Sequence, residues 1–114
     1  MNNLNLIDSI FRRICEIASM CGLVIKELPS GGVYVRIIKD DISLWNSWEW
    51  ENKEQFLISD DNDTSLFSFL TNEDQGSYLK DKINLSFINL CKTLNDCECI
   101  EELVLKMDLM GICV

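Results

Sequence analysis

The chain has 114 residues, 47% of them hydrophobic, and a formal net charge of −9. This length suits a single domain, residues 1–114, that buries about two-thirds of the surface its unfolded form exposes, and the apolar content argues against intrinsic disorder. Because the chain contains no histidine, catalysis that needs a histidine base is excluded, and the negative charge disfavours nucleic acid and anionic membranes as partners.

The first predicted element is an amphipathic helix over residues 4–21. Apolar side chains recur there at helical spacing, an asparagine can cap the start, and Gly22 stands where a helix ends in the left-handed conformation. An extended apolar stretch over residues 23–28 and a turn at residues 29–32 follow. The apolar face of the helix comprises Leu4, Ile7, Phe11, Ile14, Ala18 and Cys21.

Three antiparallel strands are predicted next, over residues 33–38, 42–50 and 55–59. Their apolar side chains alternate, as they do in strands with one buried face, and short polar turns connect them. The alternating residues are Val33, Val35 and Ile37 in the first strand, Ile42, Leu44, Trp48 and Trp50 in the second, and Phe56 and Ile58 in the third.

The second half of the chain is predicted to be mainly helical. A short apolar piece at residues 66–70 lies between two loops, and residues 79–94 then carry apolar side chains at helical spacing, with Ser77 as the cap. A last helix is predicted to begin after Asp96, its expected cap, and to end at Gly111.

This order predicts an α+β fold, in which an antiparallel sheet of three or more strands is packed by an N-terminal helix and C-terminal helices. Partial alternation over residues 83–90 leaves a strand open as an alternative there, and the sequence does not decide whether residues 60–90 contain an additional strand or helix. No apolar run approaches the ~20 residues that cross a bilayer, and the first residues lack the pattern of a secretory signal. We therefore expect a cytosolic protein.

Residues that would carry catalysis or bind metal are sparse. Glu49 and Glu51 share a strand face, which is more typical of a solvated sheet surface than of paired catalytic carboxylates. The six cysteines lack zinc-site spacing and basic neighbours, and they suit free structural thiols. The polar run at residues 60–65 lacks the glycine and glutamate of an EF-hand loop. We expect no enzyme activity, no metal and no cofactor.

The negative charge is concentrated in residues 40–74, which hold ten of the nineteen acidic side chains and one base, Lys53. Such a segment attracts cations and basic proteins. Three tryptophans lie in it beside acidic residues, which argues against base stacking. Trp48 and Trp50 share the apolar strand face and are interpreted as core, whereas Trp45 breaks the alternation and is interpreted as an interface residue.

The N-terminal half resembles the small acidic chaperones of bacterial type III secretion systems, of the class that serves individual effectors. Many of these proteins begin with an amphipathic helix, pass through a short Gly-Leu extended stretch and a turn, and continue into three antiparallel strands. In this chain the similar parts are Leu4 to Cys21, then Cys21-Gly22-Leu23-Val24-Ile25, Gly31-Gly32, Val33 to Ile38, Ile42 to Trp50 and Gln55 to Ser59.

The resemblance implies a dimer, with itself or with a second chaperone, that binds an extended N-terminal segment of a secreted effector or gatekeeper protein and keeps it competent for export. In such chaperones a further helix and a strand hairpin often build the dimer, and here only residues 60–76 offer room for them. Apolar area supplies affinity, and an acidic surround steers basic clients. The resemblance places client contacts at Leu4, Ile7, Phe11, Val33, Val35, Ile37 and Trp45.

A second class of protein also fits the sequence, namely a small acidic inhibitor or immunity protein that covers the basic site of a nucleic-acid-binding protein such as a nuclease. Its partner would be folded and basic, whereas the client of a chaperone would be extended. A structural subunit of a larger assembly is a third alternative. The acidic surface assigned to the inhibitor comprises Glu49, Glu51, Asp60, Asp61 and Asp63.

Overall fold

The computed structural model of the protein describes residues 3–38, 47–58, 65–72 and 82–113. Within these ranges an N-terminal helix, a three-stranded antiparallel sheet and further helices follow one another, so the predicted α+β fold class is confirmed. No helix in these ranges combines the length and the apolarity needed to cross a membrane. The elements are α1 (Asn3–Met20), β1 (Leu23–Glu27), β2 (Val33–Ile37), β3 (Ser47–Trp50), α2 (Lys53–Leu57), α3 (Leu66–Thr71), α5 (Leu85–Leu94) and α6 (Ile100–Leu109).

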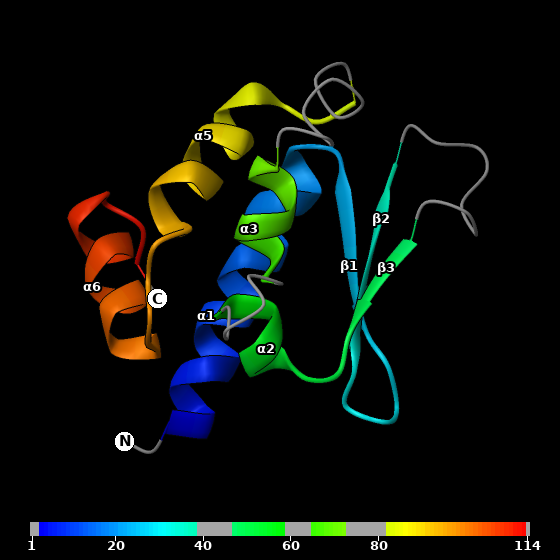
Figure 1. The fold of residues 1–114 in the computed structure, drawn as a ribbon, viewed down its shortest axis with the longest axis horizontal. Helices are drawn as coiled ribbons and strands as arrows, with labels where there is room; N and C mark the ends of the chain where they lie inside the picture. The colour runs from blue at the N-terminus through cyan, green and yellow to red at the C-terminus, as the bar shows by residue number, and fades with distance from the viewer. Residues whose placement is uncertain (1–2, 39–46, 59–64, 73–81, 114) are drawn as a thin grey trace.

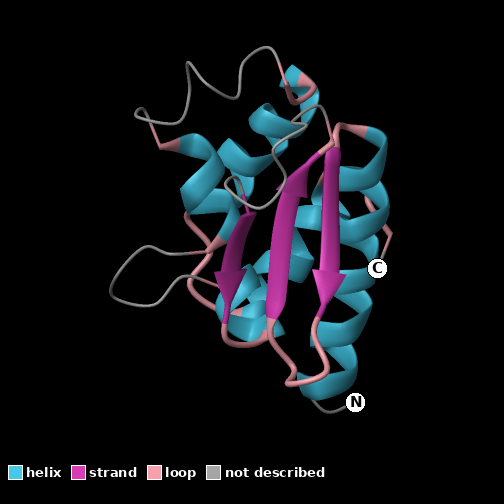
Figure 2. Cartoon of the chain, turned by 90° about the vertical axis from the view of Figure 1, so that its right-hand side faces the viewer, coloured by secondary structure: helices cyan, strands magenta, loops and turns pink. Residues whose placement is uncertain are grey.

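The elements form three layers (Figure 1). The sheet lies at one side of the molecule, α1, α2 and α3 pack in the middle, and α5 and α6 lie on the far side of these helices. Seen from the side of the sheet, the three strands stand in front of the helices, which cover only the face behind them (Figure 2). The core therefore lies between the inner face of the sheet and the surrounding helices.

Helix α1 is the predicted amphipathic helix, because its apolar residues recur every three or four positions and so form one continuous stripe. Ile10 and Ile14 on that stripe have no exposed surface, and Ala18 is equally buried. The helix ends at Met20, and Gly22 in the turn that follows has a φ of +106°, in the left-handed region that glycine tolerates best. The prediction for this segment is confirmed to within one residue at each end.

The turn at Gly22 joins three parts of the fold. The Gly22 carbonyl accepts a hydrogen bond from Ile38 N at 2.9 Å, and the neighbouring Cys21 carbonyl accepts one from Asn84 N, also at 2.9 Å. A Cβ atom at Gly22 would stand 2.8 Å from the Lys82 carbonyl oxygen, so the approach of the chain before α5 requires glycine here.

The sheet is an antiparallel meander in the order β1-β2-β3. The first two predicted strands correspond to β2 and β3, with residues 42–46 outside the described residues, but the third predicted strand is not part of the sheet. The extended stretch after Gly22 supplies β1, which pairs with β2 from Leu23↔Ile37 onward. Residues 55–58, the described part of the third predicted strand, belong to α2 and its C-terminal end, because Asn52 caps this helix by accepting a hydrogen bond from Gln55 N at 2.8 Å. The two apolar residues in alternation, Phe56 and Ile58, were too short a pattern to distinguish a strand from one helical turn.

The C-terminal helices correct two further predictions. Helix α5 is capped by Asn84, which accepts a hydrogen bond from Ser86 N at 2.9 Å, and not by Ser77, which lies outside the described residues. The strand considered for residues 83–90 is wrong, because α5 begins at Leu85. The short apolar piece at 66–70 is the helix α3, with Ser65 as its cap.

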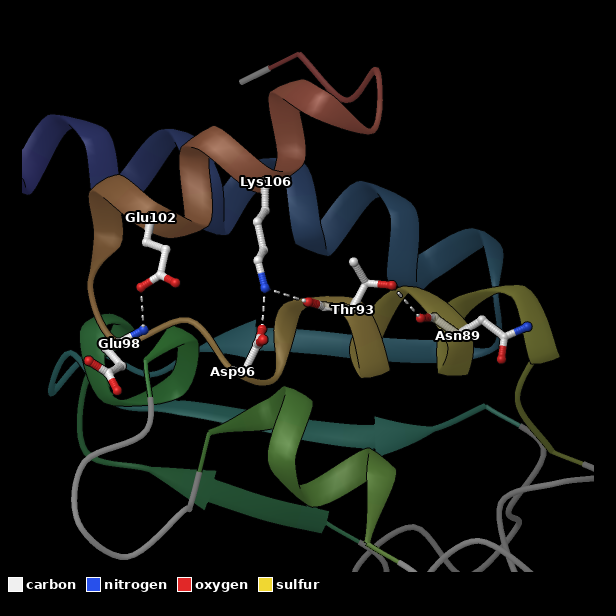
Figure 3. A network of polar contacts seen from close by, with 6 residues as sticks. All are labelled: Asn89, Thr93, Asp96, Glu98, Glu102 and Lys106. Atoms are coloured by element: carbon white, nitrogen blue, oxygen red, sulfur yellow. Dashed lines mark hydrogen bonds and ion pairs between the residues drawn. The ribbon is translucent and has the colours of Figure 1, made fainter.

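Helix α6 is held against α5 by side chains that point to the connecting segment (Figure 3). The prediction that Asp96 caps this helix is wrong, because the N-cap position is Cys99; the Asp96 carboxylate pairs with the Lys106 ammonium instead. Lys106 Nζ also donates to the Thr93 carbonyl oxygen at 3.3 Å, near the C-terminus of α5 where a positive charge is favourable. Glu102 stabilises the start of α6 by accepting a hydrogen bond from Glu98 N at 3.0 Å.

Candidate binding groove beside the edge strand

Most of the residues predicted to contact a client lie inside the protein. The side chains predicted on α1 and β2 are 0–5% exposed and belong to the core that joins α1 to the sheet. Trp45 lies outside the described residues, and of Leu4 the structure describes only its place in α1. In this conformation the buried side chains offer no surface to a partner. The residues concerned are Ile7, Phe11, Val33, Val35 and Ile37.

Beside the sheet, apolar side chains reach the surface in a groove along β3. It is lined by residues of β3 and α3 and by Gln55 of α2, and its volume is about 450 Å³. Because β3 lies at the edge of the described sheet, the groove follows a strand that has a neighbour on one side only. We call it the aromatic groove, and its lining residues are Trp48, Glu49, Trp50, Glu51, Gln55, Ser68, Phe69 and Asn72.

Three aromatic rings form the floor of the groove. The Trp48 and Phe69 rings pack with their centroids 4.5 Å apart, and both side chains are half-buried. Trp50 lies deeper, 8% exposed, with its ring centroid 5.0 Å from that of the buried Phe56. The interpretation of Trp50 as core is confirmed, whereas Trp48 divides its surface between the core and the groove.

Local structure explains why these side chains converge. Trp48 pairs with Val35 and Trp50 with Val33 across the sheet, so alternation directs both tryptophans to the inner face. Glu49 lies between the two tryptophans in sequence, so its side chain projects from the outer face of the sheet. From that face it reaches the rim of the groove. Phe69 arrives from α3, whose first turn is capped by Ser65. The groove thus combines segments that are some twenty residues apart in sequence.

The rim of the groove is acidic. Glu49 and Glu51 are both exposed, as is Glu54 on α2. Asp60, Asp61 and Asp63, which were assigned to the same surface, lie outside the described residues. A cationic group entering the groove would therefore meet carboxylates at its edge and aromatic rings at its floor, an arrangement that favours lysine and arginine side chains.

Lys53, the base within the acidic segment, forms its ion pairs on the side of α2 away from the groove. Its ammonium forms ion pairs with Asp8 at 2.8 Å and Glu27 at 3.1 Å, and it lies 5.1 Å from the centroid of the Phe11 ring. The hydrogen bond that Lys53 donates to the Asp8 carboxylate is the main cause of a raised pKa for Lys53. These contacts tie α1, β1 and α2 together across a cavity of about 310 Å³, which also touches Cys15.

The thiols offer little reactivity where they are buried. Desolvation raises the pKa of Cys15 and of Cys97 to about 11, and it raises the pKa of Cys91 as well. These three groups are protonated at neutral pH and are weak nucleophiles. Cys99 and Cys113 are exposed, and all six cysteines are free. Among the described residues no three cysteine or carboxylate groups converge in a way that could hold a metal ion.

The fold and the groove define a small α+β domain with an acidic, aromatic surface beside an edge strand. Comparison with protein-family models, with curated proteins and with solved structures found no match. The resemblance to type III secretion chaperones therefore stays a prediction. The feature that the sequence interpretation missed is the contribution of Phe69 to the floor of the groove, and the serine cap at Ser65 was the signal that α3 is a helix.

Proposed function

We propose that this protein is a non-enzymatic, chaperone-type binding protein that holds an extended, basic segment of another protein in the aromatic groove. The observation that carries the proposal is the half-buried pair Trp48 and Phe69, which lies in a groove along the edge strand β3 whose lining also includes Glu49 and Glu51.

Two physical properties of the groove support an extended ligand. A strand at the edge of a sheet can pair with an added strand, and the alternate side chains of that strand then enter pockets beside it. Tryptophan is the side chain most enriched at binding hot spots, because its large rigid surface is desolvated at low entropic cost. The groove supplies both, with Trp48 as the anchor next to β3.

The resemblance of the N-terminal half gives the class of client. In this proposal the client is the N-terminal segment of a secreted effector or a related protein, which the chaperone keeps unfolded until export. Contacts made by the groove replace the ones expected from Ile7, Phe11 and the β2 valines, because those side chains are used by the core. Binding consumes no nucleotide and requires no cofactor.

A second candidate is favoured by the charge around the groove. Glu49, Glu51 and Glu54 are exposed together, while Lys53 is paired with Asp8 and Glu27. An acidic surface of this kind also suits an inhibitor that covers the basic site of a folded nuclease. The two functions differ in the state of the partner, since a chaperone binds an unfolded segment and an inhibitor binds a folded protein.

The test is to isolate the complex that the tagged, full-length protein forms in its own cells, and to digest it briefly with protease. A chaperone protects a partner segment of about 20–50 residues that shows no stable structure by circular dichroism when it is synthesised alone. Recovery of a folded basic partner whose nuclease activity is blocked would replace the chaperone proposal by the inhibitor. The binding constant of the protected segment is then measured by fluorescence anisotropy.

Variants in the groove connect that binding to the structure. Trp48→Ala is expected to weaken binding of the protected segment by about 30-fold, corresponding to about 2 kcal/mol at a hot spot. Glu49→Lys combined with Glu51→Lys keeps the aromatic floor and tests the charge alone. Met20→Ser, at a side chain that is 78% exposed on α1, is the matched control outside the groove. Equal binding by Trp48→Ala and Met20→Ser would remove the groove from the proposal.

A further inference from the structure

A second exposed apolar region lies on α6, on the side of the molecule opposite the sheet (Figure 1). Leu105 is 59% exposed and Leu109 is 78% exposed, and Met110, directly after the helix, is 41% exposed. These three make up half of the large hydrophobic residues that are exposed in the described ranges. An isolated exposed leucine is ordinary, but three within six residues form a patch.

The patch includes a groove because the chain turns back after α6. Gly111, with a φ of +81°, allows the Ile112 backbone N–H to donate to the Met107 carbonyl oxygen at 2.9 Å. Ile112 is thereby returned beside the helix, and a cavity of about 330 Å³ opens between them. We call this region the α6 surface, and it comprises Glu101, Val104, Leu105, Asp108, Leu109, Met110 and Ile112.

The charge on the α6 surface is entirely negative. Glu101 and Asp108 line its groove, whereas the base of this helix, Lys106, points to α5 and bonds Asp96 and the Thr93 carbonyl (Figure 3). The inward face of α6 carries Leu103 and Met107, both fully buried. The outward face therefore presents aliphatic side chains with carboxylates beside them and no neutralising base among the residues of the α6 surface.

We infer that the α6 surface docks a basic amphipathic helix of a partner protein. Leucines four residues apart on one helix form the ridge against which a second helix packs, and lysine or arginine at the edge of the incoming helix pairs with Glu101 and Asp108. A second copy of this chain is a poor occupant, because a two-fold pair of α6 helices would bring four carboxylates together without a base. An anionic membrane is repelled by the same carboxylates.

This inference uses residues of α6 and its C-terminal turn only, so it stands or fails independently of the aromatic groove. The probe is a fluorescent amphipathic peptide of about 18 residues, with leucines on one face and lysines on the other. Its binding to the full-length protein is followed by anisotropy and compared with that of a peptide in which glutamates replace the lysines. We expect the basic peptide to bind at least about tenfold more tightly than the acidic one.

Matched variants locate the binding. Leu105→Ser combined with Leu109→Ser is expected to weaken the basic peptide by at least about tenfold, while Leu85→Ser changes it less than about twofold. Leu85 is a suitable control because it is 63% exposed and belongs to α5. Circular dichroism and thermal melting confirm that each variant is folded.

A charge-matched pair separates docking from general attraction to an acidic protein. Glu101→Lys with Asp108→Lys changes the net charge by the same amount as Glu16→Lys with Glu27→Lys, two exposed positions outside both the aromatic groove and the α6 surface, and only the first pair should weaken the basic peptide by about tenfold or more. Equal weakening by both pairs overturns the inference, and so does failure of the basic peptide to bind at about 1 mM. Dimerisation or binding to neutral lipid vesicles that Leu105→Ser with Leu109→Ser abolishes would also overturn it, in favour of a second copy or a membrane.

Discussion

The aromatic groove and the α6 surface combine the same ingredients, apolar side chains with carboxylates beside them, but they are built differently. The groove is assembled from β3, α2 and α3, and its floor rests on the buried Phe56. The α6 surface belongs to one helix and the turn that follows it. The first surface depends on tertiary packing, whereas the second depends mainly on α6 being helical. Substitutions in and near the two surfaces should therefore differ in their effect on stability.

The largest effect is expected beneath the groove. Phe56 has no exposed surface, and its ring lies 5.6 Å from that of Phe11 and 5.0 Å from that of Trp50. Phe56→Ala is expected to lower the free energy of unfolding by about 3–5 kcal/mol, because it leaves a cavity under the groove. Leu105→Ala, on the α6 surface, should change it by less than about 0.5 kcal/mol.

Urea denaturation followed by tryptophan fluorescence measures both variants. The contrast between them is the informative quantity, since it compares a side chain in the packed floor with one on an exposed helix face. A loss below about 1 kcal/mol for Phe56→Ala would mean that the ring is not closely packed, and would count against the architecture of the groove.

A smaller effect is expected at the turn that joins the two sides of the molecule. Gly22→Ala places a Cβ 2.8 Å from the Lys82 carbonyl oxygen at a φ of +106°, so strain and a steric clash add. Gly111→Ala, after α6, has a φ of +81° but no atom within 4 Å of the new Cβ. We expect losses of about 2–3 kcal/mol at Gly22 and about 1 kcal/mol at Gly111.

Thermal melting of the two glycine variants gives this comparison directly. A loss at Gly111 equal to that at Gly22 would show that backbone strain alone decides the cost. The expected excess at Gly22 would show that the segment before α5 approaches the α1–β1 turn as closely as the structure indicates.

Much of the fold could be predicted from the sequence, and the wrong predictions have identifiable physical causes. Helix α1 was predictable because its apolar residues keep a helical spacing over more than four turns, and a strand would not produce this spacing. The segment at 55–59 was not, since Phe56 and Ile58 satisfy a strand and a helical turn equally, and the deciding signal was the cap at Asn52. Short elements are decided by polar caps and tertiary contacts more than by apolar periodicity.

The candidate site was harder to predict than the fold for a physical reason. Apolar residues at regular spacing mark a core and a binding surface alike, so Val33, Val35 and Ile37 were assigned to a client although the core uses them. The groove itself depends on Phe69 lying against Trp48, a contact between segments about twenty residues apart. Only the tertiary structure shows which aromatic side chains remain partly exposed.

Lys53 and Lys106, which both form ion pairs, provide a third and weaker contrast. Lys53 lies beneath the Phe11 side of α1, is 22% exposed, and has a raised pKa through its hydrogen bond to Asp8. Lys53→Met is expected to lower the free energy of unfolding by about 1 kcal/mol at neutral pH, from the ion pairs and the contact with the aromatic ring. Lys106→Met, which removes the contact with Asp96, is the matched change beside α6.

The pH dependence of Lys53 follows from the direction of its pKa shift. A raised pKa means that the folded protein holds the proton more tightly than the unfolded chain, so this stabilisation is fully present below about pH 10.4 and is lost as pH rises through the folded-state pKa. Unfolding free energies measured between about pH 8 and 11 should fall for the wild type more than for Lys53→Met. Parallel curves for the two proteins would contradict the assignment of the ion pairs.

The smallest change concerns thiol accessibility, which reports on α6 without altering stability. Cys99 and Cys113, on either side of α6, are exposed, whereas Cys91 and Cys97 are buried. At about pH 8 a thiol reagent should therefore label Cys99 and Cys113 first, while Cys91 and Cys97 stay slow because burial both blocks access and raises their pKa. Mass spectrometry of timed samples identifies the labelled sites. If Cys97 reacts early while Cys91 remains protected, α6 opens apart from the packed body, and the α6 surface is then the more independent of the two surfaces.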